Sequence, residues 1–399
     1  WKHYRIKKII NSAWEQRKLD DVAEFSKGNG YSKGDLIEVG TPIILYGRLY
    51  TKYETSISDV DTYVEAKEGS VYSKGGEVIV PASGETAEDI ARAATVDKSG
   101  ILLGGDLNVV MPNKDINSAF MAISISNGNS QRELAKKAQG KSVVHIHNEE
   151  IRNLIVPFPN KVEQDKIVDY FTNLDHLITL HQRKCDETKK LKKYMLQKMF
   201  PQNGEKVPKI RFAGFSDDWE QRKVGDITKE LSEYAKLNSG LPLLTSARTG
   251  LMYQSDYRGN STTDNENTLF SIVPLNACTY RHMSDDSTFH INVNTLEKGL
   301  VSKEYPVFVE NESDLRFVVQ YINSSDSFTK FCTEQKKGGT RTRLYYKTLC
   351  EYKMLIPSLN EQHIIADYFD NLDYLITLHQ QKCDELQNIK KFMLKNMFA

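Results

Sequence analysis

The sequence predicts an α+β protein made of two mixed α/β domains joined by two long helices, which pair as an antiparallel coiled coil in a pseudo-twofold arrangement. Three observations support this fold class. The chain of 399 residues contains one nearly identical block twice. Each copy has the heptad pattern of a long helix, and the segments between the copies contain short strand-like runs. No run of about 18 apolar residues occurs, so the sequence offers no membrane-spanning helix.

The repeats define the organisation of the chain. Residues 163–200 and 361–398 align without gaps and share 25 of 38 residues. A pentapeptide, Trp-Glu-Gln-Arg-Lys, begins at Trp14 and again at Trp219. Between these matched ends the two halves share little sequence. Duplication with divergence confined to the middles indicates two modules of one architecture with different specificities.

Both copies of the long block have residues suited to a buried seam at alternating intervals of four and three, which is a heptad pattern. A helix of 38 residues would be about 57 Å long. Two such helices bury their seams most simply against each other, although two separate helices packed on their own domains are an alternative. The predicted seam residues are Phe171, Leu174, Ile178, His181 and Cys185 in the first helix, and Phe369, Leu372, Ile376, His379 and Cys383 in the second.

The divergent segments predict mixed domains. Strand-like runs occur at residues 41–46, 77–80, 107–111, 267–273 and 305–309, and helical spacing occurs at 117–126 and 314–323. The expected layout is a lead segment (1–13), a first domain (14–156), a helical spacer (157–203), a linker (204–218), a second domain (219–356) and a second spacer (357–399). Trp1 stands in place of an initiator Met, which is consistent with a sequence that begins inside a longer chain.

Composition restricts the class of protein. Lys and Arg number 53, as do Asp and Glu, so the net charge is zero and any basic surface must be local. Five cysteines without a Cys-x-x-Cys pair favour reduced thiols over a disulfide framework or a zinc ribbon. The first residues lack the apolar stretch of a signal peptide, so a cytoplasmic location is expected.

Catalytic motifs are missing from the sequence. Gly140-Lys141-Ser142 has the end of a phosphate-binding loop, but Ala135 stands where its first Gly belongs, so a polar turn is the better interpretation. Nuclease, methyltransferase, zinc-protease and serine-hydrolase motifs do not occur. The His and Cys pairs of the two seams could in principle hold zinc, but structural zinc sites usually use tighter loop spacings, so no metal site is predicted.

Basic residues gather at equivalent places in the two halves, shortly before each repeated helix. The second cluster includes a Gly-flanked loop with hydroxyl side chains, which suits phosphate oxygens. A solvated charged loop is the alternative. The predicted phosphate-contacting residues are Lys136, Lys137 and Lys141 in the first half, and Lys336, Lys337, Arg341 and Arg343 in the second.

Aromatic and basic residues also interleave near the start of each domain. The Arg side chain offers a fork that reads guanine in the major groove, and Tyr and Thr supply phosphate and methyl contacts. Tyrosines at alternating spacing are also typical of packing on a strand. The predicted DNA-binding residues are Tyr46, Arg48, Tyr50 and Lys52 in the first domain, and Arg248, Tyr253 and Arg258 in the second, with Arg48 and Arg248 as the preferred base readers.

The layout resembles the specificity (S) subunit of type I restriction–modification systems, the HsdS family. The resemblance rests on the two repeated blocks, the Trp-Glu-Gln-Arg-Lys heads and the Pro-x-x-x-Glu-Gln leads at Pro159 and Pro357, and it covers essentially the whole chain. It implies that the divergent domains are target recognition domains, each reading one half-site of a bipartite target in double-stranded DNA. The helices would then set the distance between the half-sites.

The resemblance further implies a non-catalytic chain that docks two methyltransferase (M) subunits, to which two restriction/motor (R) subunits add. S-adenosylmethionine and ATP with Mg would belong to those partners, and no cofactor to this chain. One departure is that an Arg-Phe-x-Gly-Phe run at 211–215 precedes Trp219 and has no counterpart before Trp14. A coiled-coil scaffold that binds proteins, or an unrecognised nuclease in one divergent domain, are the competing interpretations.

Overall fold

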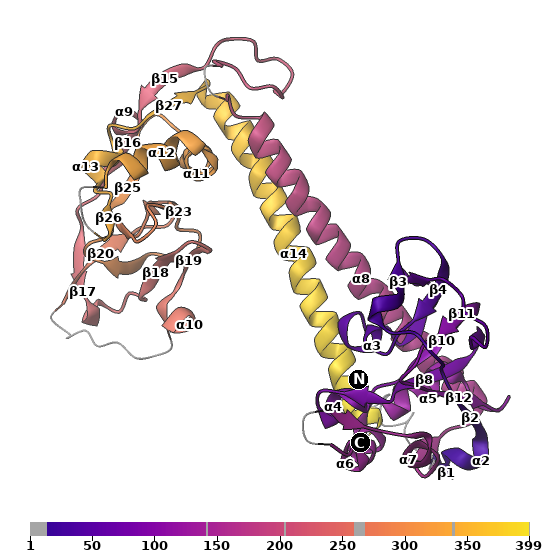
Figure 1. Ribbon diagram of the computed structural model, residues 1–399. Coiled ribbons are helices and arrows are strands. Elements are labelled where there is room, and N and C mark those ends of the chain that lie inside the picture. Colours follow the sequence, from indigo (N-terminus) through magenta and orange to yellow (C-terminus); the bar gives the residue numbers. More distant parts are fainter. Residues whose placement is uncertain (1–13, 141–142, 203–204, 259–267, 337–339, 399) are drawn as a thin grey trace. The chain divides into compact units, whose positions relative to one another are not determined.

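The computed structural model describes residues 14–140, 143–202, 205–258, 268–336 and 340–398. The chain divides into two compact units (Figure 1). The first unit consists of Trp1–His181 with Gln381–Ala399, and the second of Gln182–Gln380. The division therefore falls inside two long helices, α8 (Lys161–Lys198) and α14 (Leu359–Met397), so each unit contains one mixed domain and part of both helices.

The domain of the first unit is built on two five-stranded sheets, ordered β2-β12-β8-β10-β5 and β3-β6-β4-β11-β7. The pairs β10–β5 and β11–β4 are parallel and the remaining pairs are antiparallel. The sheet strands are β2 (Ala23–Lys27), β3 (Leu36–Ile37), β4 (Thr41–Ile44), β5 (Ser56–Ile57), β6 (Tyr63–Val64), β7 (Tyr72–Lys74), β8 (Glu77–Pro81), β10 (Ala94–Val96), β11 (Ser99–Leu103) and β12 (Leu107–Pro112). The helices of this domain are α2 (Leu19–Val22), η1 (Lys33–Asp35), α3 (Arg48–Thr51), α4 (Ala87–Ile90), α5 (Ser118–Ile125), α6 (Gly128–Lys137) and α7 (Asn148–Arg152).

The domain of the second unit has a four-stranded sheet, β16-β25-β21-β23, a three-stranded sheet, β17-β20-β24, and the hairpin β18–β19, all antiparallel. Their strands are β16 (Thr228–Glu230), β17 (Tyr234–Lys236), β18 (Leu244–Ala247), β19 (Gly250–Tyr253), β20 (Leu269–Val273), β21 (Cys278–Thr279), β23 (Asn292–Val293), β24 (Gly299–Ser302) and β25 (Val307–Glu310). The helices are α9 (Val224–Ile227), η2 (Leu237–Ser239), α10 (Gln254–Arg258), α11 (Leu315–Ser324), α12 (Asp326–Glu334) and α13 (Tyr346–Leu349).

The structure confirms the predicted strand-like and helical segments of both domains, each of which forms a strand or a helix in the expected region. The tyrosine-rich segment after β4 is an exception. Alternating tyrosines there suggested a strand, but residues Arg48–Thr51 form the short helix α3. Hydrogen bonds from the amides of Thr51 and Lys52 to the carbonyls of Gly47 and Arg48 hold this turn, so local helical bonding replaces the expected ladder.

The repeated pentapeptide closes each domain. In the first unit it forms β1 (Glu15–Lys18), which pairs antiparallel with β14 (Ile155–Phe158), the strand that leads into α8. In the second unit β15 (Glu220–Lys223) pairs in the same way with β27 (Lys353–Ile356), which leads into α14. The preceding Trp219 is buried, and the unit-one Trp14 donates its indole N–H to Glu163 at the start of α8. The pentapeptide therefore fastens the beginning of each domain to its end.

The Gln of each Pro-x-x-x-Glu-Gln lead bonds the residue directly before a second helix, α5 in the first unit and α11 in the second. The Gln164 carboxamide oxygen accepts the backbone N–H of Asn117, and its amide donates to the Pro159 carbonyl at 2.9 Å. Gln362 repeats both bonds in the second unit, to Asp314 and Pro357. Both glutamines are about 1% exposed. A buried side chain that satisfies two backbone groups explains why the Gln recurs.

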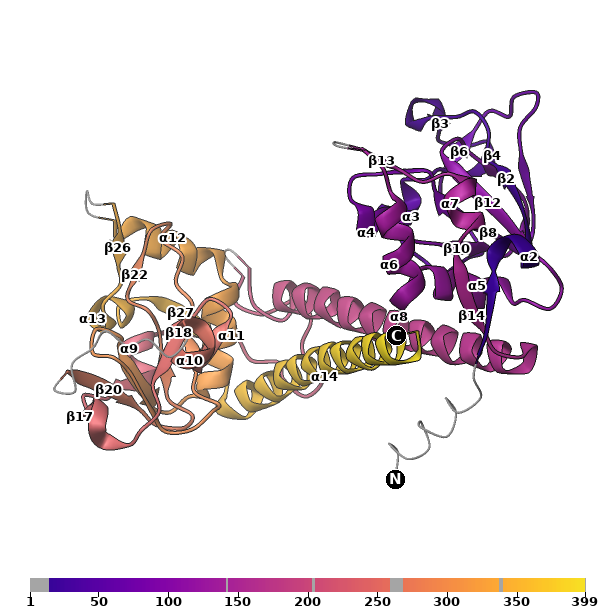
Figure 2. The same ribbon diagram turned by 90° about the horizontal axis from the view of Figure 1, so that it is seen from below.

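Within each unit, part of α8 runs antiparallel to part of α14 (Figures 1 and 2). In the first unit Lys390 forms an ion pair with Asp175, and in the second Lys192 forms an ion pair with Asp373 at 2.7 Å. The two pairs are equivalent, because Lys390 and Asp373 each lie 198 positions after Lys192 and Asp175, and 198 positions separate the two copies of the repeated block. Of the predicted seam residues, Phe171, Leu174, Cys185, Phe369, Leu372 and Cys383 are buried, and Ile178, His181, Ile376 and His379 are partly buried. Phe171 and Leu174 belong to the core of the first unit, and Phe369 and Leu372 to that of the second.

Each helix end completes a hydrophobic core. In the first unit Phe398, just after α14, packs edge-on against Trp14 at 5.7 Å and also contacts Phe120. The backbone of Phe398 lies so close to Gly128 that a Cβ there would meet its carbonyl oxygen at 1.6 Å. In the second unit Phe200, just after α8, packs against Trp219 in the same way. No helix among the described residues is both long and apolar enough to cross a membrane.

Candidate nucleic-acid interface

Each unit carries a two-stranded antiparallel ribbon at the same place in its sequence. In the first unit β9 (Ser83–Gly84) pairs with β13 (Val144–His145). In the second, β22 (Met283–Ser284) pairs with β26 (Thr342–Arg343). The later strand of each ribbon directly precedes a short helix, α7 or α13, and then the strand that leads into the long helix. Of the two basic clusters predicted from sequence, the first places Lys136 and Lys137 at the end of α6, before β13, and the second places Arg341 just before β26 and Arg343 within it.

Alternation along these strands separates an inner from an outer face. Ile146 and Leu344 are fully buried and occupy equivalent inner positions. The residues on either side of them, His145 and His147 in the first unit and Arg343 and Tyr345 in the second, are exposed. A two-stranded ribbon is narrow enough to enter the major groove of DNA. The outer faces are therefore the candidate interface.

The outer face of the second-unit ribbon is cationic and aromatic. Arg343 of β26 lies opposite Met283 of β22, and two exposed residues flank these strands, Tyr345 after β26 and Arg281 before β22. Tyr345, 53% exposed, stacks on the ring of His282 with 5.7 Å between ring centroids. Burial, together with the nearby charges of Arg343 and Arg281, lowers the pKa of His282 despite the opposing effect of Glu304. The imidazole is therefore uncharged at neutral pH, and the two arginines carry the positive charge of the ribbon.

The first-unit ribbon presents two histidines. The rings of His145 and His147 lie nearly parallel, 6.5 Å apart. His145 Nδ1 is 3.1 Å from the hydroxyl oxygen of Ser83. The Tyr50 hydroxyl donates to the Ser83 carbonyl at 2.7 Å, and Tyr46 packs edge-on against Tyr50. Two tyrosines predicted from sequence are thus placed beside this ribbon, whereas the histidines were missed.

Two predicted arginines are held beside the second ribbon by adjacent carboxylates. Arg248, in the β18–β19 turn, pairs with Asp286 at 2.6 Å, and Arg341 pairs with Asp285 at 2.8 Å. A hydrogen bond from Arg248, supported by Ser284 and a backbone amide, holds the pKa of Asp286 well below its usual range. Both arginine side chains are more than half exposed. Exposed pairs contribute only about 0–1 kcal/mol, so phosphates or bases can displace these carboxylates at little cost.

Arg48, the other preferred base reader, is placed differently. Its side chain is only 8% exposed and its guanidinium bonds Glu54 and Asp61, both at 2.7 Å, and also the Asp59 carbonyl. Hydrogen bonds from Lys52 and Arg48 lower the pKa of Asp61 to about 2. The guanidinium is the buried member of these pairs, because the side chains of Glu54 and Asp61 are 44% and 64% exposed. The structure therefore counts against Arg48 as a base reader and gives it a structural role in the loop around α3.

The other predicted contacts stay predictions. Lys136 pairs with Glu133, Lys52 with Asp61, and the Tyr253 hydroxyl donates to Glu297. Lys137 is partly buried and Lys336 is exposed. The side chains of Lys141, Lys337 and Arg258 lie outside the described residues.

A basic groove of about 520 Å³ lies in the first unit between α6 and the end of α14. Arg132 lines it, and three lysines that sequence analysis did not connect with this cluster also line it: Lys390, Lys391 and Lys395. These lysines lie on the repeated helix, more than 250 positions along the chain from α6. The groove adds local positive charge to a chain of zero net charge.

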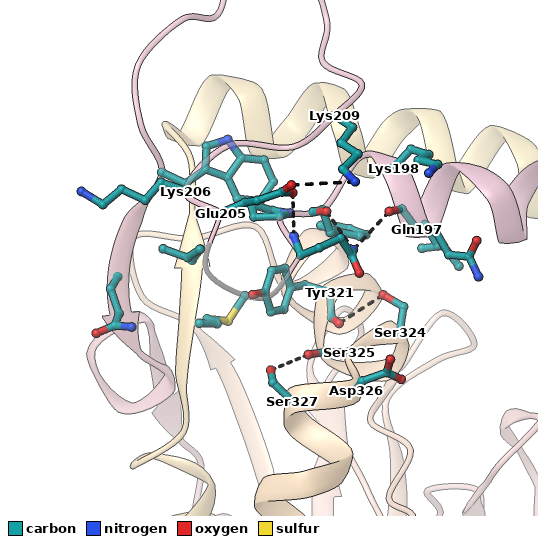
Figure 3. Close-up of a pocket in the computed structure, with 18 of the residues that line it drawn as sticks. Gln197, Lys198, Glu205, Lys206, Lys209, Tyr321, Ser324, Ser325, Asp326 and Ser327 are labelled. Atoms are coloured by element: carbon teal, nitrogen blue, oxygen red, sulfur yellow. Dashed lines mark hydrogen bonds and ion pairs between the residues drawn. The ribbon is translucent and has the colours of Figure 1, made fainter.

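A cavity of about 1300 Å³ in the second unit lies between the end of α8, the linker and α12 (Figure 3). Two of its lysines pair with acids of the same cavity, Lys206 with Asp218 at 3.7 Å and Lys209 with Glu205 at 3.8 Å. Two of its hydroxyls, on Ser325 and Ser327, bond the Tyr352 hydroxyl. The cavity is a seam between the linker and the domain, with its polar groups used internally. Among the described residues, no group of three or more His, Cys, Asp or Glu side chains could hold a metal ion.

Comparison with known proteins places the chain among DNA specificity domains. The family profile described as "Type I restriction modification DNA specificity domain" matches residues 11–190 and 286–388. A Methanocaldococcus jannaschii protein assigned as the type I restriction enzyme MjaX specificity subunit is 24% identical over 96% of this chain and 92% of its own. The MjaVIII specificity subunit of the same organism is 20% identical over 95% and 90%. The crystal structure of a type I restriction–modification S subunit from M. genitalium shares the fold, with a TM-score of 0.62, 14% identity and coverage of 98% and 97%.

Proposed function

The chain belongs to the family of type I restriction modification DNA specificity domains, and from this premise we propose that it reads a bipartite target in double-stranded DNA, one half-site per unit. Family membership confirms the predictions that the chain is a type I restriction–modification specificity subunit and that it is non-catalytic. The proposal adds that each unit reads a different half-site of the target.

One observation carries the bipartite proposal. The two units repeat the same supports, including the pentapeptide strand, the buried Gln and the ribbon before the long helix. The exposed residues on the ribbons nevertheless differ at every outer position of β13 and β26 and the residues that follow them. A scaffold kept constant beneath different exposed side chains is expected where two sites read two different sequences. The kind of residue at the variable positions favours DNA recognition over a protein-binding scaffold, because these positions include cations and aromatic rings that can contact phosphates and bases.

The partners follow from the same proposal. The chain would dock two methyltransferase (M) subunits, and two restriction/motor (R) subunits would add to that complex. S-adenosylmethionine and ATP with Mg would bind to those subunits. Sharing DNA with basic partners would also accommodate a specificity subunit whose own net charge is zero.

The proposal is tested by methylome sequencing of a methylation-free host that expresses this chain with its cognate M subunit. We expect one split motif, which disappears when the chain is omitted. A stable complex that methylates nothing, or a continuous unsplit motif, would contradict the proposal.

The spacing role of the helices can be tested separately. Seven residues inserted at matched positions of α8 and α14, after Lys189 and Gln387, keep the heptad pattern and lengthen both helices by about 10 Å. The gap between the half-sites should grow by about three base pairs while both half-sites keep their sequence. An unchanged gap would show that the helices do not set the spacing.

A further inference from the structure

We propose that the first outer position of each ribbon, His145 in the first unit and Arg343 in the second, determines base specificity, and that Arg343 reads a guanine. This inference rests on the proposed function and deepens it by naming the residues that read each half-site. It also states which kind of base the second unit requires.

The two positions are structurally equivalent. They are separated by 198 residues, the offset of the repeated helix. Each stands directly opposite a residue of the ribbon's other strand, His145 opposite Ser83 and Arg343 opposite Met283. Each is followed by a fully buried residue and then by an exposed ring, that of His147 or Tyr345. The buried residue fixes the direction in which its neighbours point, so the two side chains occupy the same place on the same scaffold.

Among the described residues Arg343 has no carboxylate partner, a property that it shares with Arg281 on the same ribbon but not with Arg248 or Arg341; Arg343 alone of these two occupies the position equivalent to His145. Arg248 and Arg341 each donate to an aspartate, and Arg48 in the first unit donates to two acids. An arginine that is exposed yet unpaired leaves all five N–H donors available. The ring of His282 stacks on that of Tyr345, and burial lowers the pKa of His282, so the positive charge here is carried by the arginines.

The chemistry of that arrangement favours guanine. The forked guanidinium matches the O6 and N7 acceptors that guanine presents in the major groove, and such bidentate pairs are the commonest specific contacts in DNA recognition. Histidine cannot make this bidentate pair, because its two ring nitrogens point in different directions and cannot both reach O6 and N7 of one guanine. The His145 ring, oriented by the Ser83 hydroxyl, must therefore read a different pattern. The same position then gives the two units different specificities.

The test uses the purified complex of this chain with its M subunit and duplexes that carry the bipartite motif. Each guanine of the second half-site is replaced in turn by 7-deazaguanine, which lacks the N7 acceptor. The wild-type complex should lose about tenfold or more in affinity at one position. The variant Arg343→Ala should bind more weakly but show no further loss there, because the contact is already missing.

Two variants separate base reading from charge. Arg343→Lys keeps the charge but not the fork, so it should keep most of the affinity while losing discrimination at that guanine. Arg341→Ala should weaken binding to all sequences alike, as expected for a phosphate contact. His145→Ala should relax the first half-site and leave the second unchanged. Because all three side chains are exposed, the melting temperature serves as the check that each variant is folded.

The outcomes distinguish this inference from the function it rests on. A wild-type complex without a split methylation motif overturns the proposed function itself. A split motif whose second half-site contains no guanine, or whose guanines are all read equally well by Arg343→Ala, overturns the assignment of Arg343 and leaves the proposed function intact. Equal weakening on every sequence would make Arg343 a phosphate contact and would overturn it as well.

Discussion

The two ribbons are alike inside and different outside. Their inner faces carry Ile146 and Leu344, both fully buried and equivalent in position. Their outer faces carry a stacked pair of histidines in one unit, and two arginines with a tyrosine stacked on a buried histidine in the other. If the ribbons read DNA as proposed, stability and recognition are assigned to opposite faces of the same two-stranded element. This separation lets the exposed residues change without disturbing the support beneath them.

The largest expected effect tests the shared inner face. Ile146→Ala and Leu344→Ala each remove a buried aliphatic side chain, which should cost about 2–5 kcal/mol of unfolding free energy. The comparison predicts similar losses in the two units, measured by denaturant unfolding. A loss in only one unit would show that the two ribbons are not equivalent supports.

The next effect contrasts the two arginines that sequence analysis singled out. Arg48→Ala removes a nearly buried guanidinium that bonds Glu54, Asp61 and a backbone carbonyl, and because both carboxylates are partly exposed it should cost about 1–3 kcal/mol of stability. Arg248→Ala breaks only an exposed pair, so stability should change by less than about 1 kcal/mol. We expect Arg248→Ala instead to reduce binding to the second half-site, measured by competition with duplexes altered in one half. If Arg48→Ala proved stable and altered only DNA binding, its structural role would be wrong.

The smallest effect concerns pH. The hydrogen bond from Arg248 lowers the pKa of Asp286 below its ordinary value of 3.8, so folding favours the ionised carboxylate. Its contribution to stability is therefore present above that ordinary value and is lost as the pH falls through the lowered pKa. Because the pair is exposed, the contribution should be at most about 1 kcal/mol. Wild type and Asp286→Asn should differ slightly in unfolding free energy at pH 6 and converge in strong acid. A difference that grows on acidification would contradict this assignment.

Periodic and repeated features could be predicted from the sequence because they depend on local spacing. The two long helices, their buried seam and the strands around residues 77–80 and 107–111 all follow from patterns within a few turns of chain. The repeat also predicted that a cluster of basic residues lies shortly before each long helix. Local pattern is sufficient where one face of an element is buried throughout its length.

The interface itself depends on contacts far apart in the chain. Ser83 and His145 are separated by 62 positions, and Arg341 and Asp285 by 56, so spacing alone could not reveal either contact. A count of cations likewise could not show that Arg48 and Arg248 are neutralised by acids. The sequence did contain one indication of these positions. When the ungapped alignment of the repeat is extended upstream of the helices, Ile146 aligns with Leu344 and His145 aligns with Arg343. Two-residue strands are too short for a periodic pattern to expose them.

The packing of Phe398 onto the first unit has a consequence for the order in which the protein is made. The second unit is one continuous stretch, Gln182–Gln380, whereas the first needs residues from both sides of that stretch. A chain leaving the ribosome therefore has the whole of the second unit available before residues 381–398 emerge to cover Trp14 and Phe120. Domains that emerge first usually fold first. Here the core of the N-terminal domain stays incomplete until the whole of the second unit, Gln182–Gln380, has been synthesised.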